Sequence, residues 1–110
     1  MLKRTFGAIA LSLMAGSALA GTTPIADIQR GQSVTVAGVV DRFFDTDEIR
    51  LRDETGTVRV YLGPQPLPIV SGERLVVEGI MDDDLVMNEL YARQITRQNG
   101  EKIGISRTYD

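Results

Sequence analysis

Arginine is concentrated in one short stretch of the chain, where it alternates with apolar residues. Arg50 and Arg52 flank Leu51, and Arg59 follows close to Tyr61. A guanidinium offers a planar, bidentate fork to a phosphate or a carboxylate, and a phenol ring adds a stacking surface. Arg50, Arg52, Arg59 and Tyr61 therefore predict a site for a small anionic ligand or for the acidic group of a glycan.

The same arginines have acidic neighbours in the sequence. Glu48, Asp53 and Glu54 lie within a few residues of them, and exposed ion pairs of this kind are ordinary features of protein surfaces. Pairing on a solvated face is therefore the alternative interpretation. Like charges placed close together across a hairpin cost stability, so the arginine cluster needs an explanation of one kind or the other.

Aspartates cluster in two other short segments, D-T-D at 45–47 and D-D-D at 82–84. Clustered carboxylates can hold a hard cation such as Ca²⁺. The candidate ligands of this alternative metal site are Asp45, Asp47, Asp82 and Asp84. The spacing matches no defined calcium loop, and aspartate is a common turn residue. We therefore predict two turns, with no resident metal and no cofactor.

The composition removes several classes of mechanism. The 110 residues include neither cysteine nor histidine, which excludes disulfides, thiolate or imidazole metal sites, and catalysis by those side chains. The sequence also has no G-x-S-x-G, P-loop or G-x-G-x-x-G motif. We expect a protein that works by association and is not an enzyme.

The N-terminus has the pattern of a secretory signal peptide. Lys3 and Arg4 precede an apolar stretch, and A-L-A at 18–20 is a small-x-small cleavage site. We predict export to the periplasm with cleavage after Ala20, and no later segment long and apolar enough to span a membrane. The mature chain would carry 10 basic and 15 acidic residues, a net charge of −5 against −3 for the whole chain.

The mature chain has the periodicity of short strands. A proline and a glycine bracket apolar residues spaced by three between Thr23 and Gly31, which predicts a short helix. Apolar and polar residues then alternate, and the expected strands cover roughly 33–43, 49–52, 58–62, 74–80 and 86–97. The alternation in the last strand slips by one residue, which predicts a β-bulge at Arg93 or Gln94. The proline-rich segment 63–68 is the long connection.

These elements predict an all-β fold, a small five-stranded Greek-key OB-fold barrel with a short N-terminal helix. An SH3-like barrel is the nearest competitor. We expect residues 1–20 to be the signal peptide, 21–97 the OB-fold domain and 98–110 a C-terminal tail, in which Ile103 and Ile105 could briefly extend strand pairing.

Three segments resemble a known family: V-T-V-A-G-V-V at 34–40, L-R-D-E-T-G-T-V-R-V at 51–60 and V-E-G at 77–79. Together they are similar to the bacterial OB-fold family of small exported proteins of the YgiW and YdeI stress-tolerance type. The resemblance implies a periplasmic, non-enzymatic OB barrel that contributes to tolerance of envelope or chemical stress, with an envelope protein as a further class of partner.

An OB barrel uses the outer face of its second and third strands for binding, which is where the arginines and Tyr61 fall. The F-F pair at 43–44 would send one ring to the core and leave Phe44 near the binding loop, or both rings would plug the barrel end. Single-stranded nucleic acid is disfavoured because the mature chain is acidic and has no tryptophan. A structural or protein-docking module that uses Val76 and Ile80, or the C-terminal tail, is the alternative function.

Overall fold

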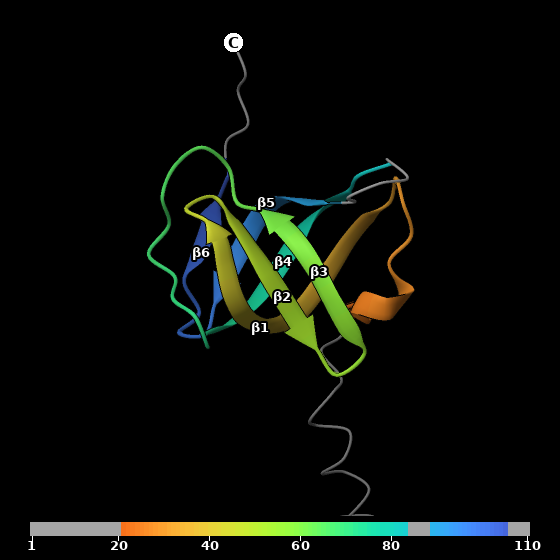
Figure 1. Cartoon of the computed structure of the whole chain (residues 1–110), viewed down its shortest axis with the longest axis horizontal. Coiled ribbons are helices and arrows are strands. Elements are labelled where there is room, and N and C mark those ends of the chain that lie inside the picture. The colour runs from red at the N-terminus through yellow and green to blue at the C-terminus, as the bar shows by residue number, and fades with distance from the viewer. Residues whose placement is uncertain (1–20, 84–88, 106–110) are drawn as a thin grey trace, which may run out of the picture.

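The structure is a computed structural model that describes residues 21–83 and 89–105. In this part of the chain it has one 3-10 turn and six strands (Figure 1). Their bounds are η2 Ile25–Asp27, β1 Ser33–Asp45, β2 Glu48–Asp53, β3 Gly56–Tyr61, β4 Arg74–Met81, β5 Leu90–Arg97 and β6 Lys102–Gly104. The predicted signal peptide and the predicted start of the last strand at Val86 lie outside the described residues. Within those residues, no helix is long and apolar enough to cross a membrane.

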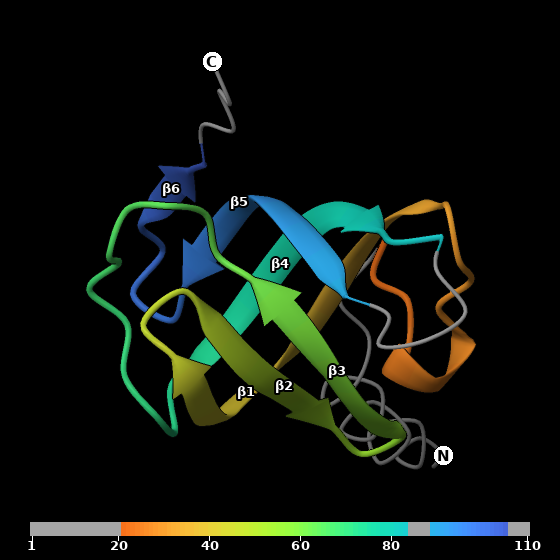
Figure 2. The same cartoon turned by 45° about the horizontal axis from the view of Figure 1, so that its top comes forward.

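The sheet closes on itself. The strands follow the order β3-β2-β1-β4-β5-β6 (Figures 1 and 2). A short parallel pairing of β3 with β5 closes the sheet into a ring, and β6 lies outside that ring on the far side of β5. The resulting ring, β1-β2-β3-β5-β4, is the predicted five-stranded Greek-key barrel. Closure removes free sheet edges, which stabilises a domain of this size without disulfides.

One face of every barrel strand is apolar and fills the interior. The predicted inward residues of the β2–β3 hairpin are all buried: Ile49, Leu51, Val58, Val60 and Leu62. Side chains from β1, β4 and β5 complete the same core, and those with less than 2% of their surface exposed include Val36, Val40, Val77, Leu90, Ala92 and Ile95. The period-two pattern of the sequence therefore assigned the core faces correctly.

Strand β1 belongs to both halves of the barrel. Val39 is the Cα partner of Arg74 on β4 and also of Arg52 on β2. Beside it, a Cβ atom on Gly38 would lie only 2.6 Å from the carbonyl oxygen of Arg52, so glycine permits the close approach of two backbones at this bend. In β5, the register steps from Ala92 to Gln94 opposite consecutive residues of β4, which confirms the bulge expected near Arg93.

The predicted short N-terminal helix is present as the single 3-10 turn η2. Distant side chains take its first N–H groups: Asp53 accepts from Ile25 at 2.9 Å, and Thr55 accepts from Ala26 at 2.9 Å. Ile28 is already in an extended conformation. The spacing of three places Ile25 in the core and Ile28 partly buried against it.

Part of the predicted C-terminal tail pairs with the barrel. The short strand β6 is antiparallel to β5, with Ile103 opposite Ile95. The Ile105 N–H donates to the carbonyl of Arg93 at 2.8 Å, and the Ile105 side chain packs against the core. Brief pairing by Ile103 and Ile105 is thus present in the described part of this segment.

Candidate ligand-binding face

Two irregularities in β1 shape the outer face of the β2–β3 hairpin. The register with β2 steps from Val40 to Arg42 and again from Phe43 to Asp45, each time opposite consecutive residues of β2. The extra residues of the two bulges are therefore Asp41 and Phe44. Bulges re-aim side chains, and both residues contact arginines of the hairpin. We call this surface of β1, β2 and β3 the arginine face.

The predicted arginines lie together, joined by one that the sequence analysis did not single out. Arg42 on β1 is the direct partner of Arg50 on β2, and Arg50 is the direct partner of Arg59 on β3. Three guanidinium-bearing residues therefore form one row across three neighbouring strands. Arg42 was not predicted, because its pairing with Arg50 depends on the register between β1 and β2, which the local sequence does not show.

Asp41 holds the centre of the arginine face. Its Oδ2 accepts from Arg50 Nε at 2.6 Å, and its Oδ1 accepts from Arg52 Nε at 3.4 Å. The hydrogen bond from Arg50 holds the pKa of Asp41 below its usual value. Two arginines thus share one carboxylate, and Arg52 keeps 52% of its side chain exposed.

Arg59 is fixed on two sides. Its guanidinium carbon lies 3.9 Å from the centroid of the Phe44 ring, and Nη1 donates to Glu48 Oε1 at 3.1 Å. The Arg42 guanidinium lies 5.2 Å from the same ring. Phe43 instead packs against the core, as expected for one ring of the pair. The Phe44 ring is engaged by the protein's own cations, which leaves it less able to stack on a base or a sugar.

The anticipated acidic partners are only partly those observed. Glu48 pairs with Arg59 as expected, but Arg50 and Arg52 use Asp41. Asp53 is occupied by the η2 contact and by Thr55. Partial burial raises the pKa of Asp53, but the hydrogen bonds it accepts outweigh that effect and hold the pKa below its usual value.

A carboxyl pair borders the face where β3 meets β5. Burial raises the pKa of Glu89 to about 7, with hydrogen bonding and repulsion from Glu48 adding to the effect. The Glu89 Oε2 atom is buried and has no hydrogen-bond partner among the described residues. Glu89 directly precedes β5, so the parallel closure of β3 on β5 brings it to Glu48. Only that long-range pairing could have identified this residue.

Tyr61 lies at the same border. Its ring meets that of Tyr91 edge to face, with centroids 5.9 Å apart, because the two residues are partners across the β3–β5 pairing. The Tyr91 hydroxyl also donates to Asp82 Oδ2 at 3.4 Å. Tyr61 is therefore part of a tyrosine pair beside the arginine row and does not lie within it.

The alternative metal site at the two aspartate clusters has no suitable geometry among the residues described. In 21–83 and 89–105, no three carboxylate, thiol or imidazole residues are arranged to hold a metal ion. Asp45 accepts the N–H of Thr46 at 2.7 Å, as a turn residue does. The Asp47 carbonyl accepts from the Leu62 N–H at 2.7 Å, which extends the β2–β3 pairing by one step. Asp84 lies outside the described residues.

The barrel matches solved structures. The hypothetical protein YgiW from E. coli is similar with a TM-score of 0.60 and 19% sequence identity, over 71% of this chain and 90% of that one. The chain has an OB fold. The telomere capping protein Ten1 from Saccharomyces pombe is similar with a TM-score of 0.56 and 24% identity, over 74% and 84% of the two chains.

A chain in the S. pombe Stn1–Ten1 complex is also similar, with a TM-score of 0.57 and 22% identity, over 78% of this chain and 83% of that one. No family model matches the sequence, and no curated protein matches it. At these identities the likeness is one of fold. The predicted resemblance to the YgiW type is thus confirmed for the OB barrel that it implied.

Proposed function

We propose that this chain is an exported OB-fold binding protein that holds an anionic group of a small ligand or glycan on the arginine face, and that it acts by association. The observation that carries this proposal is the row Arg42–Arg50–Arg59 across three adjacent strands. Like charges at directly opposed positions cost stability. A bound anion would offset that cost.

The charges on the face support an anionic ligand. The arginines Arg42, Arg50, Arg52 and Arg59 share two carboxylates, those of Asp41 and Glu48. Glu89 is nearby, but with a pKa of about 7 it carries less than a full negative charge at neutral pH. The face therefore keeps a local positive excess on a chain that is acidic overall.

The same geometry favours one anionic group over a long polyanion. Single-stranded nucleic acid needs aromatic platforms along a basic groove, but the Phe44 ring is covered by Arg59. The net charge of −3 for the chain, or −5 without residues 1–20, also opposes a run of phosphates. A single carboxylate or phosphate can instead take a bidentate contact from one guanidinium.

Export and a role in stress tolerance rest on the sequence. The signal-peptide pattern at residues 1–20 and the resemblance to the YgiW and YdeI type support both. Two measurements test them: the N-terminal sequence of protein released by osmotic shock, expected to begin at Gly21, and the survival of a deletion strain under envelope stress. Intracellular protein that retains Met1, or unchanged survival under every stress applied, would count against the respective part.

Binding is tested with the double variant Arg42→Ser/Arg50→Ser, purified after expression of the full-length sequence. Inorganic phosphate and trigalacturonate serve as separate probes in isothermal titration, which distinguishes a free anion from a glycan acid. We expect the variant to lose about tenfold or more in affinity for the probe that binds, and added salt to weaken the wild-type signal.

The matched control is Arg30→Ser/Arg93→Ser, which removes two exposed arginines that lie outside the face. It has the same net charge as the test variant. Equal affinity in the two double variants would reject the arginine face as the site. The docking alternative predicts a different outcome, a stable dimer in sedimentation that Ile80→Lys dissociates.

A further inference from the structure

A concave surface adjoins the arginine face, where β1 passes from β4 to β2. It has a volume of about 490 Å³ and is lined by β1, β4, the end of β5 and the β2–β3 turn. Cavities of this size accept small organic ligands. We call it the β1–β4 groove. It lies away from the Arg42–Arg50–Arg59 row, and Arg52 is the residue that it shares with the arginine face.

The floor of the groove is apolar and continuous across strands. Ala37 on β1 is the direct partner of Val76 on β4, and Val76 is the partner of Thr96 on β5. Val39 extends the floor by one further outward position of β1. These side chains point away from the core, yet Ala37, Val39 and Val76 are half-buried. Three adjacent strands span about 10 Å, which suits an extended acyl chain.

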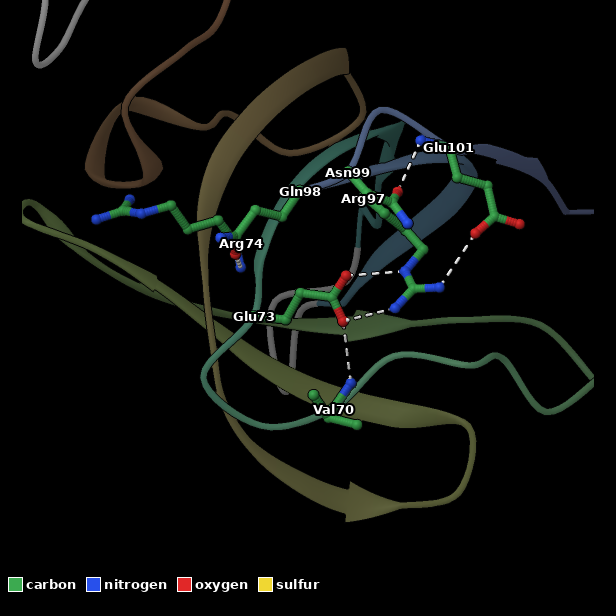
Figure 3. Close-up of polar contacts among 7 residues, drawn as sticks. All are labelled: Val70, Glu73, Arg74, Arg97, Gln98, Asn99 and Glu101. Carbon is green, nitrogen blue, oxygen red and sulfur yellow. Dashed lines mark hydrogen bonds and ion pairs between the residues drawn. The ribbon is translucent and has the colours of Figure 1, made fainter.

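Two arginines flank the floor. Arg52 and Arg74 are the Cα partners of Val39 on its two sides. The Arg74 guanidinium has no carboxylate partner among the described residues, and its backbone N–H donates to Gln98 Oε1 at 3.1 Å. Figure 3 shows its side chain extended away from the cluster around Arg97. Arg74 is thus a cation available to an anion on the apolar floor.

Arg97, at the end of the groove, is not available in this way. Nε donates to Glu73 at 2.8 Å, Nη2 to the other Glu73 oxygen at 3.3 Å, and Nη1 to Glu101 at 3.1 Å (Figure 3). The hydrogen bond from Arg97 holds the pKa of Glu73 below its usual value. This network joins Glu73, directly before β4, to Arg97 on β5 at the end of the groove. Glu54, which also lines the groove, is exposed.

We propose that the β1–β4 groove is a second binding site, for a medium-chain fatty acid. The acyl chain lies on Ala37, Val39 and Val76, and the carboxylate pairs with Arg74. The apolar floor supplies affinity through buried area, and the unpartnered guanidinium selects an anion over a neutral molecule of the same shape.

Decanoate below its micelle concentration is the probe, titrated into ¹⁵N-labelled protein and followed by amide chemical shifts. We expect saturable shifts at Ala37, Val39 and Val76. Arg74→Ser should weaken decanoate binding about tenfold and leave the weaker binding of decanol unchanged. Glu54→Gln should strengthen decanoate binding, because it removes a like charge from the groove. Arg30→Ser is the control with the same charge change away from the groove.

Three results would overturn this proposal: no shift at the floor residues, equal loss of affinity in Arg74→Ser and Arg30→Ser, or equal sensitivity of decanol to Arg74→Ser. Val76→Glu is a second variant, which puts a like charge on the floor and should abolish decanoate shifts in a protein whose circular dichroism is unchanged. Because Arg42→Ser/Arg50→Ser should leave decanoate binding intact, the two proposed sites succeed or fail separately.

Discussion

The guanidinium of Arg59 lies over the ring of Phe44, 3.9 Å from its centroid. Phe44 reaches it because it is the extra residue of a bulge at the end of β1. A strand without that bulge would give Phe44 a different register and Arg59 a different neighbour. The contact therefore links the shape of β1 to the position of Arg59, which is the end of the arginine row on β3.

This coupling can be measured by a double-mutant cycle of Phe44→Leu and Arg59→Ser in urea unfolding. A cation over an aromatic ring at a partly exposed site contributes about 0.5–1 kcal/mol, and we expect an interaction energy of that size. The cycle of Phe44→Leu with Arg93→Ser is the control and should be additive. An additive first cycle would show that the contact contributes nothing to stability.

Asp41→Asn should have opposite effects on stability and on anion binding. Asp41 is the shared partner of Arg50 and Arg52, so its neutralisation leaves the arginine row without its central counter-charge. We expect a lower urea midpoint than that of the wild type at neutral pH, and a smaller difference between the two midpoints in high salt. We also expect tighter binding of the anionic probe that binds the wild type. A loss of both stability and probe affinity would contradict the proposed site.

Glu89 should make the protein less stable as the pH rises from about 4.5 to about 7. Its native pKa of about 7 is above its usual 4.5, so folding favours the protonated carboxyl, and this contribution is complete below pH 4.5 and lost through pH 7. Glu48, Arg59 and Asp82 are the charged groups that act on it. Because Glu89 is only partly buried, solvent screening reduces the expected loss to about 1 kcal/mol.

Urea unfolding across this pH range measures the effect, and Glu89→Gln should flatten it. Asp41, Asp53 and Glu73 have lowered pKa values. Their protonation destabilises the protein only at pH values below their usual pKa, so they contribute little to the change in stability between pH 4.5 and 7. A wild-type profile as flat as that of Glu89→Gln would contradict the assignment.

Gly38→Ala should destabilise the barrel by about 2 kcal/mol, because the new methyl group would meet backbone that cannot move aside. Its Cβ would lie 2.6 Å from the Arg52 carbonyl oxygen and 3.0 Å from the Leu51 side chain. Gly104→Ala is the matched control, a strand glycine with nothing within 4 Å of an added Cβ. Equal melting temperatures for the two variants would show that β1 and β2 can separate without cost.

The strands of the barrel and their inward faces can be predicted from the amino-acid pattern alone. Alternation is a local property, so Ile49 and Leu51, or Val58 and Val60, are assigned correctly without knowledge of their partners. The slip at Arg93 was visible for the same reason, because a bulge shifts the alternation within one strand. The cationic character of the arginine face was equally local, since Arg50, Arg52 and Arg59 belong to one hairpin.

The pairing of those residues depends on how the strands come together in three dimensions. Asp41 and Phe44 meet the arginines through bulges defined against β2, and Glu89 meets Glu48 through closure of β3 on β5. The short N-terminal helix expected from a spacing of three is a single turn, and only the tertiary structure shows that the side chains of Asp53 and Thr55, far along the chain, accept its first N–H groups. Periodicity reports which face a residue occupies, whereas contacts between distant residues depend on strand register and closure, which no local pattern contains.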